Sequence, residues 1–139
     1  MVLHALIYIV AAIVSYFVAT GIPRPNDVLW LNPFLFSVPI SAAIAYFSLR
    51  LLGWLPTPKN IWVRGIVRGA TVTLAAHLMY GPISYVLVGI GDGHLSAQLM
   101  ELRSSLVTSL VSLMAAGYTL PCGIAGGLTN ELLVRKNVA

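Results

Sequence analysis

His77 lies inside a long uncharged stretch of the chain, where an ionisable side chain is costly and is often functional. Residues 69–91 contain no Asp, Glu, Lys or Arg. Tyr80 and Ser84 follow His77 at i+3 and i+7, so a helix would place the three side chains on one face. The sequence allows two interpretations. His77 is either a neutral structural histidine that bonds a neighbouring helix, or part of a polar path with Tyr80 and Ser84.

A basic cluster precedes this stretch and is formed by Lys59, Arg64 and Arg68. Gly65 and Gly69 each follow an arginine, so a lipid headgroup or another helix could approach the backbone there. Such a cluster can contact the phosphate of an anionic lipid. The alternative is ordinary snorkelling of long basic side chains at the end of a membrane span.

The clearest pattern in the chain is a stripe of small or short polar residues at steps of three and four. Membrane helices pack closely through such residues, at a crossing angle of about +20°. We interpret this small-residue stripe as a packing or association surface, either within the chain's own bundle or against another chain. It comprises Ser105, Ser109, Ser112, Ala116, Thr119, Gly123, Gly126 and Asn130, and Gly127 adds a G-x-x-x-G pair with Gly123.

Other chemistry is poorly represented. The lone Cys122 excludes an internal disulfide and a zinc site built from several cysteines. His94 with Glu101 is a weak metal signature, and His4 and His77 lie at different depths for a bis-histidine haem. We therefore expect no metal and no cofactor. No nucleophile is paired with a base, so an enzyme is the less favoured class.

The composition shows which elements must position these residues. The chain has 139 residues, of which 58% are hydrophobic and 9% charged, and the mean hydropathy is +0.89. Soluble domains carry about 25% charged residues, so a soluble globular protein and a nucleic-acid-binding module are excluded. Residues 1–23, 28–49, 69–91 and 104–130 contain no charged residue. A helix needs about 20 residues to cross a bilayer. The predicted fold is a single all-α domain, an integral membrane four-helix bundle with spans near residues 2–22, 33–53, 63–90 and 104–130.

Basic residues set the predicted orientation. Six Lys/Arg flank the second loop and the C-terminus, whereas Arg24 and Arg103 are the two on the opposite side. The positive-inside rule then places both termini in the cytoplasm, in a cell (inner) membrane. Pro39, Pro82 and Pro121 fall inside spans, and each is predicted to kink its helix.

From these residues we expect a non-catalytic membrane protein that acts by helix–helix association, as a homo-oligomer or as a subunit with other membrane proteins. One alternative is a small oligomeric transporter or channel with a polar path near the third and fourth spans. Another is a lipid-handling protein or enzyme that uses the basic cluster. A carboxylate-driven proton antiporter is disfavoured because all four acidic residues lie in loops or at span ends. The expected surroundings are the lipid bilayer, with an anionic lipid as a further contact and no nucleic acid.

Overall fold

The computed structural model describes residues 2–21, 33–91, 93, 101–114 and 116–138. These residues form five helices and no strand, which confirms the all-helical prediction. The helices are α1 (Val2–Thr20), α2 (Pro33–Leu51), α3 (Ile61–Gly91), α5 (Leu102–Met114) and α6 (Ala116–Val138). The first three occupy nearly the same residues as the first three expected segments.

Local chemistry explains where the helices begin and end. The Asn60 side-chain oxygen accepts hydrogen bonds from the backbone N–H groups of Trp62 (2.9 Å) and Val63 (3.4 Å). These N–H groups have no partner within the first turn, so Asn60 is the N-cap of α3. After α2, Gly53 adopts a φ of +69°, a left-handed conformation that glycine accepts without strain and that ends the helix.

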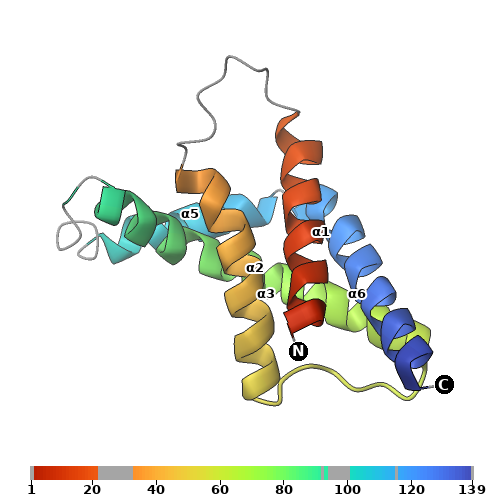
Figure 1. Ribbon diagram of the computed structural model, residues 1–139. Helices are drawn as coiled ribbons and strands as arrows, with labels where there is room; N and C mark the ends of the chain where they lie inside the picture. Colours follow the sequence, from red (N-terminus) through yellow and green to blue (C-terminus); the bar gives the residue numbers. More distant parts are fainter. Residues whose placement is uncertain (1, 22–32, 92, 94–100, 115, 139) are drawn as a thin grey trace.

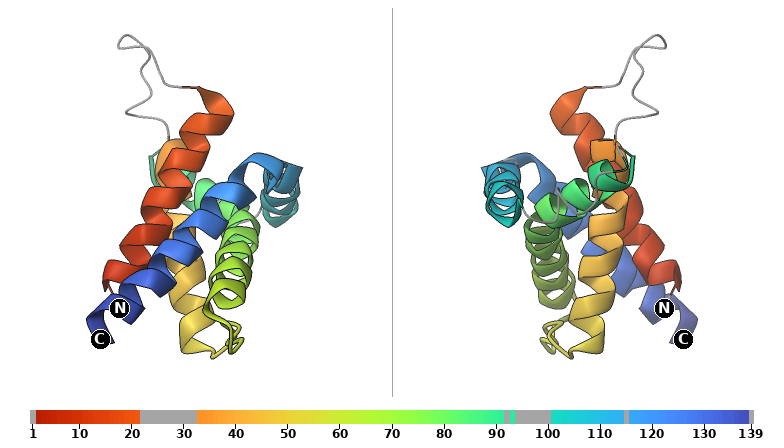
Figure 2. Two further views of the ribbon diagram at one scale, coloured as in Figure 1. Left: turned by 90° about the vertical axis from the view of Figure 1, so that its right-hand side faces the viewer. Right: turned by 90° about the vertical axis from the view of Figure 1, so that its left-hand side faces the viewer.

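The helices α5 and α6 follow one another after α3, and together they are called the last pass. α1 and α2 run antiparallel, α3 crosses the molecule, and the chain returns through α5 and α6 (Figure 1). α3 packs against α2, α5 and α6, and α1 packs against α2 and α6, but α5 and α6 hardly contact each other. The start of α1, the end of α6 and the connection after α2 lie at the same end of the molecule (Figures 1 and 2).

The last pass is broken. The segments Arg103–Met114 and Gly117–Val134 are inclined to each other by 78°. The segment expected over residues 104–130 is therefore divided between two helices of different direction. The change of direction lies before Pro121, and all three prolines lie inside helices that continue past them.

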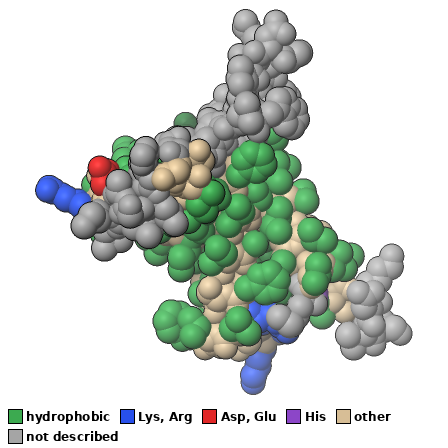
Figure 3. Space-filling model, turned by 60° about the vertical axis from the view of Figure 1, so that its left-hand side comes forward, with side chains coloured by type: hydrophobic (Ala, Val, Ile, Leu, Met, Phe, Trp, Pro, Cys, Tyr) green, Lys and Arg blue, Asp and Glu red, His purple; other side chains and the backbone are tan. Residues whose placement is uncertain are grey.

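The interior is made of small and polar side chains. Ser37, Ser41, Ser84 and Ser109 are almost completely buried, and the buried apolar residues are few, among them the stacked pair Tyr8 and Tyr46. Large apolar side chains point outward instead, as with Leu51 (78% exposed) and Met114 (82% exposed). Hydrophobic side chains cover much of the face shown in Figure 3, and the charged side chains visible there lie near its two ends.

Among the described residues, α3 is the helix long and apolar enough to cross a membrane by itself. The pair α5 and α6 passes the same test as one bent span, and the apolar segments of α1 and α2, Val2–Val18 and Phe36–Leu51, are shorter. A core helix of a soluble protein can pass this test, but such a helix is mostly buried. Only 17% of the apolar window of α3 is buried, so α3 is a candidate membrane span.

Candidate functional site

The site is built on a defect in α3 that Pro82 creates. Proline has no N–H, so the carbonyl of Leu78, four residues earlier, loses its helical hydrogen bond. Ser109 of α5 donates to this carbonyl at 2.8 Å and accepts from the N–H of Gly81 at 3.1 Å. The hydroxyl oxygen of Ser112 lies 3.2 Å from the carbonyl oxygen of His77. Side chains of α5 thus satisfy backbone groups of α3, as membrane helices with an internal proline require.

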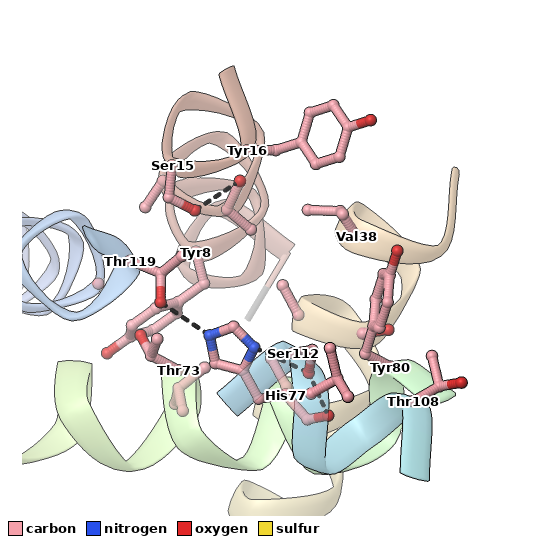
Figure 4. A pocket seen from close by; sticks show the side chains of 18 residues that line it. Tyr8, Ser15, Tyr16, Val38, Thr73, His77, Tyr80, Thr108, Ser112 and Thr119 are labelled. Atoms are coloured by element: carbon pink, nitrogen blue, oxygen red, sulfur yellow. Dashed lines mark hydrogen bonds between the residues drawn. The ribbon is translucent and has the colours of Figure 1, made fainter. Parts of the chain in front are cut away.

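His77 connects α3 to both parts of the broken pass. Its Nδ1 lies 3.1 Å from the hydroxyl of Ser112 on α5, and its Nε2 lies 2.7 Å from the hydroxyl of Thr119 on α6 (Figure 4). α5 and α6 make few contacts with each other, so this imidazole bridges two helices that are otherwise nearly independent.

The hydrogen bonds around His77 assign its tautomer. Ser112 donates its proton to the carbonyl of Ser109 at 2.8 Å, so the Ser112 oxygen can only accept from the ring. Nδ1 therefore carries the proton and donates it to Ser112. In a neutral ring Nε2 is then the acceptor, and the hydroxyl of Thr119 donates to it.

A cavity of about 360 Å³ lies beside His77 between all five helices. Its wall is mostly apolar, with hydroxyl groups distributed over it. The lining residues are Tyr8, Ala11, Ala12, Ser15 and Tyr16 from α1, Val38, Ser41 and Ala42 from α2, Val72, Thr73, Ala76, His77 and Tyr80 from α3, Thr108, Val111 and Ser112 from α5, and Thr119 and Gly123 from α6. Figure 4 shows His77 pointing into this space between Thr119 and Ser112.

Two glycine pairs join α3 to α6. Gly65 and Gly69 of α3 meet Gly123 and Gly127 of α6, and each pair has G-x-x-x-G spacing. A Cβ added to Gly69 would lie 2.7 Å from the Cα of Ile124, and a Cβ on Gly127 would lie 2.8 Å from the Cα of Gly69. The two backbones are therefore in direct contact, as small-residue packing in membranes predicts.

The small-residue stripe faces the protein's own helices. Ser109, Ser112 and Thr119 bond α3, and Gly126 packs against Ala11 of α1. Ser105 is buried, and its carbonyl lies against Gly81. The side chain of Ala116 lies outside the described side chains. Because the described stripe residues are occupied within the chain, association with another chain stays a prediction that needs another surface.

The structure brings together some residues of the predicted polar path and some residues of the basic cluster. His77 and Tyr80 line the cavity, whereas Ser84 is buried and donates to the carbonyl of Tyr80 at 2.7 Å. Arg64 Nε donates to Glu131 at 2.7 Å and Arg68 Nη1 to the same carboxylate at 2.5 Å. Lys59 is exposed.

Glu131 is the residue that sequence reasoning missed. It lies at the end of the last uncharged stretch of the sequence, yet in the structure it is 5% exposed and pairs with two arginines. The signal that could have found it is the i,i+4 spacing of two arginines, which calls for a carboxylate partner. Asn130 beside it contacts His4 Nδ1 and also hydrogen-bonds Tyr8, which joins α6 to α1.

The described residues contain no group of three His, Cys, Asp or Glu that could hold a metal ion. Two members of the loop that suggested a weak metal signature, His94 and Gln98, lie outside the described residues, as do Asp27 and Asp92. Comparison with protein families, with curated proteins and with solved structures finds no match for this chain.

Proposed function

We propose that this chain is an integral membrane protein with four passes, whose function is to bind a small, largely apolar molecule from the bilayer in the cavity around His77. The observation that carries this proposal is the cavity of about 360 Å³ at a broken helix, with a mostly apolar wall and one central imidazole. Ligand pockets of about 300–1,000 Å³ with a few placed polar groups are typical binding sites.

The distribution of side chains supports insertion in a membrane. Serines and glycines fill the interior, while large apolar side chains such as Leu78 and Leu110 face outward. Water would penalise this arrangement because about 25 cal/mol is lost per Å² of exposed apolar surface. A bilayer removes that penalty and favours packing through small residues. Four passes with both termini at the cytoplasmic side of the cell (inner) membrane agree with the Lys/Arg asymmetry.

The broken last pass supports a role for the cavity in conformational change. Discontinuous helices often form the binding sites of membrane transporters. His77 bonds α5 through Ser112 and α6 through Thr119, so a molecule bound beside the ring contacts both parts of the last pass. The same observation supports the transporter alternative, with the cavity as the substrate site.

The test is the identity of what co-purifies with the protein in mild detergent, measured by mass spectrometry of an organic extract. Ala76 lines the cavity, so Ala76→Leu should fill part of it and remove the bound molecule. Ala75→Leu is the matched control, because Ala75 is the neighbouring residue on α3 and lies outside the described lining. If all three proteins yield the same small molecules in the same amounts, the proposed function is wrong.

A second candidate function is association with another copy or another membrane subunit through the outer face of α5. Among the described elements α5 packs chiefly against α3, and its residues Leu106, Leu110 and Met114 are exposed. Crosslinking of cysteines placed at Leu110 in neighbouring chains would support this function. Migration as a monomer, with no crosslink, would contradict it.

The basic cluster of Lys59, Arg64 and Arg68 remains the proposed contact for an anionic lipid.

A further inference from the structure

The charges around the cavity restrict what it can bind. The lining residues include no Asp, Glu, Lys or Arg. Both ring nitrogens of His77 face hydroxyl groups and no carboxylate, so nothing in the wall stabilises a charged imidazole in these apolar surroundings. Arg68 and Glu131, which lie near Tyr8, are bound to each other. An ion in the cavity would be desolvated without a counter-charge, which costs several kcal/mol. The ligand should therefore be uncharged.

The hydroxyl groups of the wall have already used their protons. Each of five donates to a backbone carbonyl of its own helix, three or four residues earlier, and these are Ser15, Ser41, Thr73, Thr108 and Ser112. A hydroxyl oxygen has two lone pairs, which can still accept after the proton is donated. Ser112 uses one of them to accept from His77. The wall thus offers hydrogen-bond acceptors in an apolar setting.

The other polar groups that line the cavity are engaged as well. Thr119 hydrogen-bonds His77 at 2.7 Å, and the hydroxyl groups of Tyr8 and Tyr80 interact with Asn130 and Ser84. A ligand that only accepts hydrogen bonds would have to break one of these pairs. A ligand that donates can bind a hydroxyl lone pair without breaking any.

The volume of the cavity limits the size of the molecule that it can bind. An apolar cavity of about 150 Å³ holds a benzene molecule, so about 360 Å³ accommodates roughly a dozen non-hydrogen atoms. Alanine and valine side chains such as Ala42, Val72 and Ala76 form much of the rest of the wall, so the body of the ligand should be apolar.

We propose that the cavity takes an uncharged molecule with a hydrogen-bond donor on a small apolar body, of the class of phenols and alcohols. This inference rests on the proposed function, because it names the chemistry of the same site.

The experiment is calorimetric titration of the protein in lipid nanodiscs with three probes of similar shape, with empty nanodiscs as the blank. para-Butylphenol is uncharged and donates a hydrogen bond, para-butylanisole is uncharged and only accepts, and para-butylbenzoate is charged. We expect saturable binding of para-butylphenol, about tenfold tighter than that of para-butylanisole, as one hydrogen bond in an apolar site provides. Binding of para-butylbenzoate should be absent. Ala76→Leu should abolish the binding of para-butylphenol, and Ala75→Leu should preserve it.

The outcomes separate this inference from the proposed function. Binding of para-butylanisole or para-butylbenzoate as tight as that of para-butylphenol, lost in Ala76→Leu, would overturn the ligand class and leave the cavity as a binding site. If none of the three probes binds while a co-purified molecule is still lost in Ala76→Leu, the ligand class is again wrong and the proposed function stands. If neither the probes nor any co-purified molecule depends on Ala76, both are wrong.

Discussion

At the scale of single residues, the relation between Pro82 and Ser109 decides how α3 and α5 are joined. Ser109→Ala should lower the free energy of unfolding by about 1–2 kcal/mol, because the carbonyl of Leu78 and the N–H of Gly81 both lose their partner. In a Pro82→Ala background the restored N–H at position 82 can bond the carbonyl of Leu78. Ser109→Ala should therefore lower the free energy of unfolding by less in that background. Unfolding by SDS titration in mixed micelles measures both.

The control for this double-mutant cycle is Thr108→Val. Thr108 donates within its own helix, at 3.0 Å to the carbonyl of Ser104, and should show no coupling to position 82. If Ser109→Ala lowers the free energy of unfolding equally with and without Pro82, Ser109 does not replace the hydrogen bond that Pro82 removes from α3.

Glu131 supports a second prediction at this scale. Glu131→Gln leaves Arg64 and Arg68 facing a neutral amide, and both arginines are about one quarter exposed, at 28% and 23%. The expected loss lies between that of an exposed and of a fully buried ion pair, about 1–3 kcal/mol of unfolding free energy. The matched control is Glu101→Gln, since Glu101 is exposed and should lose less than about 0.5 kcal/mol. A smaller effect at Glu131 than at Glu101 would show that the pair contributes nothing.

Residue types alone revealed only part of the site. The uncharged surroundings of His77 are visible in the sequence, and Tyr80 lies on the same side because helical spacing places it there. Ser112 and Thr119 were predicted as residues of the small-residue stripe, but not as hydrogen-bond partners of the His77 imidazole. Their contact with His77 depends on how α5 and α6 cross α3, and local spacing carries no information on that crossing.

At the scale of helices, the contact of α3 with α6 depends on glycines. Gly69→Ala should lower the unfolding free energy by about 2 kcal/mol, because its Cβ would meet backbone atoms of Gly123 and Ile124 that cannot move as a side chain can. Gly117→Ala is the control, since nothing lies within 4 Å of a Cβ there. Alanine also favours helix by up to about 1 kcal/mol, so Gly117→Ala should be neutral or stabilising. Thermal unfolding in detergent compares the two, and equal effects would exclude backbone contact at Gly69.

Helix positions were largely predictable, whereas the break in the last pass was not. Uncharged length and the Asn60 cap locate α3 because both are local properties. Pro121 lies inside α6, further along the chain than the change of direction between α5 and α6. α5 is held by hydrogen bonds to α3 that span 28 to 35 residues of sequence, so its direction is a tertiary property.

At the scale of the whole molecule, the charges and the helix directions bear on one question, the orientation in the membrane. The start of α1, the end of α6 and the connection after α2 share one end of the molecule (Figure 1). The same end carries most of the Lys and Arg residues, which the positive-inside rule assigns to the cytoplasm. The two arguments are independent, because one comes from composition and the other from the path of the chain.

Single cysteines in a Cys122→Ser background test this orientation in intact cells with a membrane-impermeant thiol reagent. Cysteines at Asp27 and Asp92 should be labelled from outside, because they follow the first and third passes. Cysteines at Lys59 and Asn137 should be labelled only after the membrane is permeabilised, since the proposed orientation places the basic end in the cytoplasm. Labelling of position 59 in intact cells, with positions 27 and 92 protected, would show that the molecule is inserted the other way round. Equal labelling of all four positions would contradict four passes through a bilayer, because no position would then be separated from the reagent by the membrane.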